Sequence, residues 1–282
     1  MTVAVTGSSG LLGRAVVAEL VTAGIDVIRL DMVDDGSGTT VIRDLRDGAA
    51  ALSVFRGCRA IVHTAGIPRP QNHSSEELFS TNAMINFNCA ESAVAVGVSR
   101  VVNISSISVL GYPFFVQPIR PPYLPIDERQ APAPQDAYAL SKQVGEEIWA
   151  AAVRRSNRPL QVINLRMPWI QTPASFVVDI PMAMATGQDV HNLWAYIDSR
   201  DAAQAVGLVL NRDVPHKSGV CTMFVSARDN FAGRPTSDLA TSAWPGLDCP
   251  IMGEGSLLST RLAAQTVGFR PAHSWREYPA IS

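Results

Sequence analysis

Near its start the chain reads Val3-Ala4-Val5-Thr6-Gly7-Ser8-Ser9-Gly10-Leu11-Leu12-Gly13, and this stretch decides the fold. A short apolar run such as Val3-Ala4-Val5 predicts a buried parallel strand. The apolar pattern over residues 15–21 predicts a helix, and Gly24 just beyond it favours a helix end. A strand, a glycine turn and a helix in this order form the phosphate-binding unit of a doubly wound α/β sheet.

Each of the three glycines has an expected role. A side chain at Gly7 or Gly10 would block the approach of the backbone to a pyrophosphate, and Gly13 lets the helix pack close to the strand. The helix N-terminus would then offer N–H groups and a positive dipole end to the phosphates. The spacing is GxxGxxG instead of the standard GxGxxG, so a simple turn without a ligand is the alternative interpretation.

Composition narrows the class of protein. The 282 residues are 47% hydrophobic and 17% charged, which suits one large globular domain or a domain and a half. A net charge of -2 gives no reason to expect a nucleic-acid or membrane partner. The five histidines have no metal-ligand spacing, so we expect no metal, and we expect neither a signal peptide nor a membrane span. Scattered cysteines favour reduced thiols and a cytoplasmic location; they are Cys58, Cys89, Cys221 and Cys249.

An acid follows the second predicted strand, which spans residues 27–30. A carboxylate at Asp31 can hydrogen-bond the adenosine ribose and would repel a 2′-phosphate, so it favours NAD over NADP. The alternative is a solvated aspartate of the kind common in turns. Further along, Asp44 could meet the adenine, and a strand over residues 61–66 runs into small residues against which a cofactor could lie. We interpret His63 as a packed, hydrogen-bonded residue and not as a catalyst.

The rest of the chain continues the α/β pattern. One long loop, residues 112–134, holds seven prolines, and a loop of this length inside a compact domain is usually functional. An irregular stretch over residues 166–188 precedes a helix that ends near Leu210, and short helices and turns fill residues 238–282. The other predicted elements are helices over 75–98 and 135–155 and strands over 41–42, 101–106, 160–165 and 220–225.

Two side chains with a possible catalytic role share one helix face, because Tyr138 and Lys142 lie at i and i+4. The nearby ammonium is expected to lower the pKa of the phenol, which is about 10 in water. Such a tyrosine can exchange a proton with a substrate hydroxyl while hydride moves to or from nicotinamide. Ser106 ends a predicted parallel strand, where its hydroxyl can orient the reacting oxygen. By itself a YxxxK pattern also arises by chance.

Taken together, these motifs resemble the extended short-chain dehydrogenases/reductases, in particular the NAD-dependent epimerase/dehydratase type. The resemblance extends over residues 1 to about 210, and Leu262 to Trp275 is similar to the family's C-terminal pattern. The matching pieces are Thr6 to Gly13, Asp44, His63 to Gly66, Asn82, Ser105 to Gly111, Tyr138 to Lys142 and Tyr196 to Asp201.

The resemblance implies an NAD(P)-dependent enzyme of the oxidoreductase or epimerase kind, with a Rossmann-type fold. It implies that Ser106, Tyr138 and Lys142 are catalytic, and that the helices over 75–98 and 138–155 form a homodimer. It further implies cofactor contacts at Gly7, Ser9, Gly10, Leu11, Leu12, Gly13, Asp31, Asp44, Leu45, Ala65, Gly66, Asn82, Tyr138 and Lys142.

Several positions depart from the family pattern. Family dehydratases carry an Asp-Glu pair beside the catalytic hydroxyl, whereas Ile107-Ser108 follows Ser106, so we do not expect dehydration. Epimerases of nucleotide sugars commonly bind the pyrophosphate with arginines, and those positions align with Trp194 and Cys249. Several aromatic residues could wall an apolar pocket or belong to the core; they are Phe114, Phe115, Trp169, Phe176 and Trp194.

We therefore expect a doubly wound parallel α/β sheet with a small C-terminal substrate lobe. Residues 1–226 would form the NAD-binding domain, with 167–189 contributing to the substrate lobe formed by 227–282. The favoured function is NAD-dependent interconversion of an alcohol and a ketone on a small non-nucleotide substrate: a sugar, a sugar acid or an apolar metabolite. A sugar or nucleotide-sugar epimerase is the first alternative. A binding protein that has lost turnover is the second.

Overall fold

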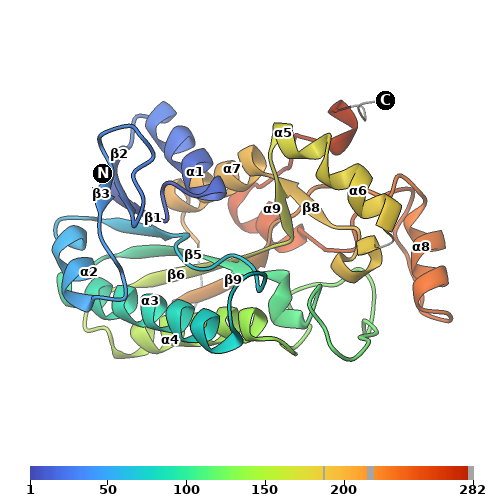
Figure 1. Ribbon diagram of the computed structural model, residues 1–282, viewed down its shortest axis with the longest axis horizontal. Coiled ribbons are helices and arrows are strands. Elements are labelled where there is room, and N and C mark those ends of the chain that lie inside the picture. Colours follow the sequence, from blue (N-terminus) through green and yellow to red (C-terminus); the bar gives the residue numbers. More distant parts are fainter. Residues whose placement is uncertain (187, 215–218, 279–282) are drawn as a thin grey trace.

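The computed structural model describes residues 1–186, 188–214 and 219–278, and these contain a seven-stranded parallel sheet (Figure 1). The strand order is β3-β2-β1-β4-β5-β6-β9, so the direction of progression reverses between β1 and β4. Ligands of such sheets bind at the carboxyl ends of the strands beside this reversal. The doubly wound prediction is confirmed. The strands are β1 Thr2–Thr6, β2 Asp26–Asp31, β3 Val41–Ile42, β4 Ala60–His63, β5 Arg100–Ser106, β6 Gln161–Met167 and β9 Val220–Phe224.

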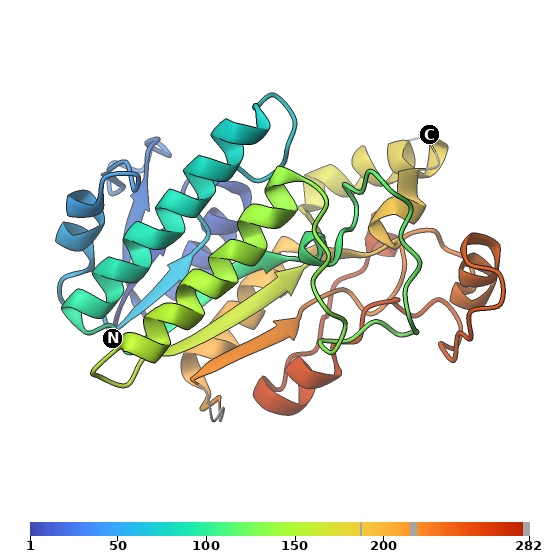
Figure 2. The same cartoon turned by 90° about the horizontal axis from the view of Figure 1, so that it is seen from below.

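Helices cover both faces of the sheet, and Figure 2 shows α3 and α4 lying side by side across one of them. That face also carries α2, and its apolar residues form one buried cluster with the strands. The helices α1, α7 and α9 pack on the opposite face. The bounds are α1 Leu11–Thr22, α2 Gly48–Phe55, α3 Ser75–Val96, α4 Ala137–Arg155, α7 Ser199–Asn211 and α9 Arg261–Val267.

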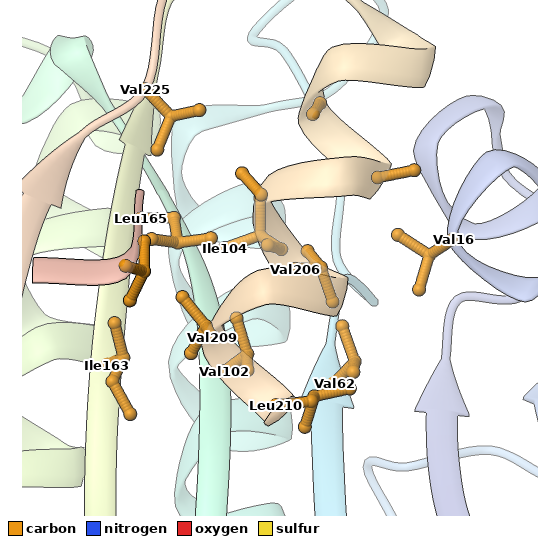
Figure 3. Packing of buried hydrophobic residues seen from close by; sticks show 14 of the residues in the cluster. Val16, Val62, Val102, Ile104, Ile163, Leu165, Val206, Val209, Leu210 and Val225 are labelled. Carbon is orange, nitrogen blue, oxygen red and sulfur yellow. The ribbon is translucent and has the colours of Figure 1, made fainter. Parts of the chain in front are cut away.

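The centre of the sheet is held by branched aliphatic side chains. In Figure 3, Val206 and Val209 of α7 lie over Val102 and Ile104 of β5, and all four are buried. Burying one such side chain contributes about 1.5–3 kcal/mol. The strands that deliver site residues are therefore fixed in place by the core beneath them.

A third buried cluster joins segments that are far apart in the sequence, from η1 (Ile107–Leu110) through Trp194 to Leu258. The prediction that residues 166–188 are irregular is wrong, because this stretch contains a strand and two short helices. These elements have no long periodic pattern and form by packing on the cluster. The remaining elements are β7 Trp169–Gln171, α5 Pro173–Phe176, α6 Asp179–Thr186, η2 Gln188–Asn192, β8 Tyr196–Asp198, α8 Thr236–Ala243 and η3 Trp275–Glu277.

Helix ends differ from the predicted ones by a few residues. The first helix starts at Leu11, immediately after its N-cap Gly10, and not near residue 15. The long helix α3 ends at Val96 because Gly97 adopts a left-handed conformation, with φ of 77°. The helix expected from residue 135 begins at Ala137, since the Asp136 side chain accepts hydrogen bonds as its N-cap. No part of α2 was predicted.

A row of polar side chains crosses the interior of the sheet. Thr6, His63, Asn103, Asn164 and Thr222 are register partners on five neighbouring strands. The Thr6 hydroxyl lies 2.9 Å from His63 Nδ1, Asn103 Nδ2 donates to Asn164 Oδ1 at 2.9 Å, and Asn164 Nδ2 donates to the Thr222 hydroxyl at 3.1 Å. Burial lowers the pKa of His63 to about 3. The prediction that His63 is packed and hydrogen-bonded is confirmed.

Among the described helices, none combines the length and the hydrophobicity needed to cross a bilayer. Within residues 1–186, 188–214 and 219–278, no three His, Cys, Asp or Glu side chains gather in a way that could hold a metal ion.

Candidate active site

The glycine loop connects β1 to α1 and packs against the exit of β4. At Gly7, φ is 67°, and an added Cβ would lie 2.7 Å from the Ala65 backbone nitrogen. An added Cβ at Gly13 would lie 2.0 Å from the Gly7 carbonyl oxygen. The predicted close packing at Gly13 is confirmed. At Gly7 the space that a side chain would need is occupied by the backbone of Ala65, and the approach of the loop to a pyrophosphate stays a prediction.

The N-terminus of α1 is built to receive an anion. Its N-cap, Gly10, provides no side-chain acceptor, and no acidic residue occupies the first turn. The N–H groups of Leu11, Leu12 and Gly13 precede the first residue that can pair within the helix, so they need an outside acceptor. An added Cβ at Gly10 would meet only the Gly7 carbonyl oxygen among the described atoms, at 3.2 Å. This loop fits the pyrophosphate of a dinucleotide.

Asp31 is fixed at the end of β2 by three backbone N–H groups. Its Oδ2 accepts from the Ser9 N–H at 2.8 Å, which joins it to the glycine loop. Its Oδ1 accepts from the N–H groups of Met32 and Val33 at 2.7 and 3.1 Å, and the Ser9 hydroxyl donates to the Val33 carbonyl at 2.7 Å. A carboxylate offers about four acceptor positions, so capacity remains for a ribose hydroxyl.

Asp44 and Leu45 follow β3 at the carboxyl-end edge of the sheet, where Asp31 also lies. Asp44 pairs with Arg46 at 2.6 Å, and the hydrogen bond from Arg46 lowers the pKa of this exposed carboxyl. Leu45 is buried, and its carbonyl accepts from Asn88 Nδ2 of α3 at 3.0 Å. A contact of Asp44 with adenine stays a prediction.

Asn82 of α3 holds the loop that follows β4. Its Oδ1 accepts from the Ile67 N–H at 2.7 Å, and its Nδ2 donates to the Ile67 carbonyl at 3.1 Å. The same Nδ2 donates to the Ser141 hydroxyl of α4 at 3.1 Å. An added Cβ at Gly66 would lie 2.9 Å from Asn82 Oδ1. Asn82 therefore positions Ala65 and Gly66 by fixing the backbone beside them.

The structure brings Ser106, Tyr138 and Lys142 together where β5 meets the first turns of α4. The Ser106 hydroxyl lies near enough to the Tyr138 phenol to lower the pKa of that phenol, and it donates to the Ser108 hydroxyl at 2.9 Å. Lys142 Nζ donates to the Ile104 carbonyl at 2.9 Å and lies 5.7 Å from the centre of the Tyr138 ring. These groups suit a proton transfer beside a bound nicotinamide.

Burial dominates the electrostatics of this cluster. It raises the pKa of Tyr138 to about 12, against the smaller lowering effect of the hydrogen bond with Ser106. It lowers the pKa of Lys142 to about 8, and the negative charge of Glu146 opposes that change. The expectation that Lys142 brings the pKa of the phenol below its usual value is therefore wrong for this structure. Tyr138 holds its proton at neutral pH.

Sequence reasoning missed a buried ion pair next to this cluster. In α4, Oε1 of Glu146 accepts a hydrogen bond from the Ser105 hydroxyl at 2.5 Å and another from Arg166 Nε at 2.9 Å. Its Oε2 accepts from Arg166 Nη2 at 2.8 Å. A signal was present in the sequence, because Glu146 continues the i, i+4 series of Tyr138 and Lys142.

One of the candidate wall residues lies at the site, and the other four belong to the buried cluster around Trp194 or pack against it. Phe114 lies at the site, with its ring edge-on to Tyr138 at 6.0 Å between centroids. Phe115 and Trp169 are half-buried, and Phe115 stacks edge-on with Tyr112. Phe176 and Trp194 belong to the buried cluster.

The two positions aligned with phosphate-binding arginines lie in the same cluster. Trp194 is 5% exposed, has a left-handed φ of 48° and packs against Trp244 at 6.1 Å between centroids. Cys249 is half-buried against the cluster. Neither side chain can supply a charge to a phosphate.

Comparison with known proteins identifies relatives along most of the chain. The sequence pattern of the NAD dependent epimerase/dehydratase family matches residues 3–220. An L-arabinose 1-dehydrogenase (NAD(P)(+)) of Haloferax volcanii is 26% identical over 81% of this chain and 89% of its own length. A uronate dehydrogenase of Pseudomonas putida is 32% identical, but the match spans only 51% of this chain and 52% of that protein.

Solved structures share the fold over nearly the whole chain. A short-chain dehydrogenase/reductase superfamily protein from Agrobacterium tumefaciens with bound NAD has a TM-score of 0.76 and 23% identity, covering 99% of this chain and 94% of its own. MoeE5 in complex with UDP-glucose and NAD has a TM-score of 0.73 and 21% identity, covering 99% and 96%.

Proposed function

The chain belongs to the NAD dependent epimerase/dehydratase family, and on that premise we propose that it interconverts an alcohol and a ketone on a small substrate without a nucleotide. The chain is an NAD(P)-dependent enzyme of the extended short-chain dehydrogenase/reductase type. The observation that carries the proposal is the meeting of Ser106, Tyr138 and Lys142 at the end of β5.

The three side chains have different tasks in the proposed reaction. The Ser106 hydroxyl, now bonded to Ser108, turns to the reacting oxygen and orients it. Tyr138 gives its proton to that oxygen when a ketone is reduced, and in the reverse direction its phenolate takes the proton of the alcohol. Lys142 supplies a positive charge beside the phenol, and its ammonium can hold a ribose hydroxyl. Bound NAD supplies the hydride acceptor or donor.

The proposed substrate has no diphosphate, because other residues stand at the two positions where the family pattern places phosphate-binding arginines. Trp194 and Cys249 replace the expected arginines. Arg200, which could substitute for them, already donates Nη2 to Asp198 Oδ2 at 2.7 Å and to the Tyr278 hydroxyl at 2.7 Å. Arg228 and Arg234, which could also substitute, are exposed. A buried diphosphate without charge-assisted donors would cost several kcal/mol of desolvation. Two of the relatives have names that denote free sugars or uronates, which supports the same choice.

The second candidate is a sugar or nucleotide-sugar epimerase, which would use the same three side chains and return the hydride to the other face. A UDP-glucose 4-epimerase of rice, 26% identical over 77% of this chain and 56% of its own length, favours it. A binding protein without turnover is a third candidate, which the intact Ser106, Tyr138 and Lys142 argue against.

A substrate screen tests the proposal. The purified protein with NAD is offered free sugars, uronates and apolar alcohols, and reduction of NAD is followed by absorbance. The same protein is offered UDP-, dTDP- and GDP-sugars, with calorimetry for binding and chromatography for epimers. We expect NADH formation with a nucleotide-free alcohol. Micromolar binding of a nucleotide sugar with interconversion of its epimers would replace the proposal with the second candidate.

The proposal includes a homodimer and a location. The outer sides of α3 and α4 expose Met84, Phe87 and Leu140, at 48%, 49% and 43%. Two copies that join these helices would bury the three side chains. The four cysteines are free, three of them buried, which supports a reducing cytoplasm.

The predicted boundary at residue 226, between the NAD-binding domain and the substrate lobe, also stays a proposal. The cluster around Trp194 contains side chains from both sides of it, among them Leu110 and Phe231. Residue 187, inside the stretch 167–189, and residues 279–282 of the predicted lobe lie outside the described residues.

A further inference from the structure

A single carboxylate connects three elements directly behind the site. Glu146 of α4 binds the Ser105 hydroxyl of β5 and makes a two-point ion pair with Arg166 of β6. Ser105 and Arg166 are register partners, so both side chains leave the same face of the sheet toward α4. Exposed fractions of 3%, 9% and 5% for Ser105, Glu146 and Arg166 show that water does not compete for these bonds.

The contacts of Glu146 lie next to every group that the proposed reaction needs. Ser105 precedes Ser106 in β5, so a bond that fixes one residue fixes the peptide of the other. Lys142 lies one helical turn before Glu146, and its Nζ donates to Ile104 of the same strand at 2.9 Å. The helix that carries Tyr138 is thus attached to β5 at two successive turns.

We propose that Glu146 is a positioning residue, which sets the place of Ser106 and holds the helix that carries Lys142 against β5 through its bonds to Ser105 and Arg166. The negative charge of Glu146 also favours the ammonium form of Lys142. This inference rests on the proposed function, because it assigns Glu146 to the same Ser106, Tyr138 and Lys142 chemistry. Glu146 touches neither substrate nor cofactor in this assignment. It acts through its neighbours.

The charges around Lys142 explain why one carboxylate matters. The groups that face this region are His63 of β4, Tyr138 and Glu146 of α4, and Arg166 of β6. Glu128 approaches from the proline-rich loop, accepts from the Phe224 N–H at 2.9 Å, and feels the charge of Arg166. Without the Glu146 charge, Lys142 would lose the negative charge that favours its ammonium form, and Arg166 would be left with the charge of Glu128. Lys142 would then lose its proton more readily.

The sequence makes Lys142 unusually easy to observe, because the chain contains only two lysines, Lys142 and Lys217. In a Lys217→Arg background, isotope-labelled lysine gives one NMR signal, whose chemical shift against pH is the titration of Lys142. Glu146→Gln keeps the shape and removes the charge. Glu147→Gln is the matched control, since it removes an exposed carboxylate from the adjacent position of the same helix.

We expect Glu146→Gln to lower the pKa of Lys142 by about 1, and Glu147→Gln to leave it within about 0.2 of the parent value. An unchanged pKa in Glu146→Gln would overturn the inference. This titration uses no substrate, so it gives its answer even if no alcohol is oxidised and the proposed function fails. Circular dichroism of each variant shows whether it is folded. If Glu146→Gln does not fold, Glu146→Asp and Ser105→Ala carry the test.

These two variants separate charge from position. Glu146→Asp keeps the charge, so the pKa of Lys142 should stay near the parent value, while the shorter side chain no longer reaches both Ser105 and Arg166. Ser105→Ala keeps the ion pair and removes one bond to β5. With an accepted alcohol substrate, we expect both to lower kcat by about 5- to 50-fold with little change in KM for NAD. Parent values of kcat in both variants would overturn the positioning role.

Discussion

Burial determines the charge states of Tyr138 and Lys142, because both side chains lie in the protein interior. The i, i+4 pairing with Lys142 was expected to favour the phenolate, but both groups are buried, and burial disfavours whichever form is charged. The phenol therefore keeps its proton to about pH 12 and Lys142 loses its proton near pH 8. The geometry of the pair follows from helix spacing, whereas the depth of burial depends on what covers α4.

Replacing Tyr138 by phenylalanine should nearly abolish turnover while NAD still binds. The phenol is the group placed to move the proton, and a general acid or base of this kind contributes about 10²–10⁴-fold in rate. Steady-state kinetics and calorimetry with NAD measure the two effects. Tyr123→Phe is the control, because that hydroxyl bonds Asp127 at the surface. Near wild-type turnover in Tyr138→Phe would remove Tyr138 from the mechanism.

Asp31 predicts a preference for NAD over NADP. The three N–H groups that hold its carboxylate leave it no freedom to turn away from a 2′-phosphate. Calorimetry should show weaker binding of NADP, by about 10-fold or more. Asp31→Asn keeps an acceptor for the loop and removes the charge, so it should narrow the difference. Equal or tighter binding of NADP by the wild type would contradict this assignment.

At the scale of elements, β1, the glycine loop and α1 were predictable because their pattern is local. The glycines, the apolar run and the helix cap all lie within a short window, and each has its own physical requirement. The strand, turn and helix units of the sheet follow the same rule. By contrast, α2, β7, α5 and α6 were missed. These are short, and they owe their form to distant partners in the buried clusters.

In the candidate site too, features set by one element could be predicted and contacts between elements could not. Ser106, Tyr138 and Lys142 could be predicted because each follows from its own element, a strand end or a helix face. The bonds of Glu146 to Ser105 and Arg166 could not, since they depend on which residues of β5 and β6 lie opposite each other and how α4 crosses them. Trp194 lies before β8 as expected, but only the packed structure places its ring against Trp244.

The glycine loop gives a prediction about an element. Gly13→Ala should lower the free energy of unfolding by about 1–3 kcal/mol, because its Cβ would lie 2.0 Å from the Gly7 carbonyl oxygen. Gly10→Ala is the control, since Gly10 has an extended backbone that any residue adopts, with φ of -73°. It should keep its stability and weaken NAD binding. Chemical denaturation and calorimetry measure these effects, and a Gly13→Ala variant as stable as the parent would refute the packing argument.

At the scale of the whole molecule, stability should fall on acidification because of His63. Burial holds its folded-state pKa at about 3, whereas the unfolded chain takes up this proton below about pH 6.5. Its contribution is therefore complete above pH 6.5 and is lost as the pH falls toward 3. Between about pH 7 and pH 5 the loss amounts to about 2 kcal/mol.

The measurement is urea unfolding at both pH values for the wild type, His63→Gln and His73→Gln. His63→Gln should reduce the difference between the free energies of unfolding at pH 7 and pH 5 by about 2 kcal/mol. His73→Gln should not, because the His73 side chain is 36% exposed. The same pH dependence in wild type and His63→Gln would show that another group is responsible.

The assembly is the last prediction. Phe87→Glu should convert the proposed homodimer to a monomer, because it places a charge in the face formed by α3 and α4. Met252→Glu is the control, at a side chain that is 90% exposed away from these helices. Sedimentation velocity decides between the states. A monomeric wild type would end the proposal of a dimer.

The polar row across the sheet has a consequence for how the strands find their neighbours. Valine- and isoleucine-rich strands can substitute for one another in a parallel sheet, since their apolar faces are much alike. A slip of one residue would turn His63 or Asn164 toward the other helical layer and leave a polar group buried without its partner. Mispaired strands lose these bonds and the aliphatic contacts do not replace them. The row therefore favours one register and one set of neighbours for each of the five strands that carry it.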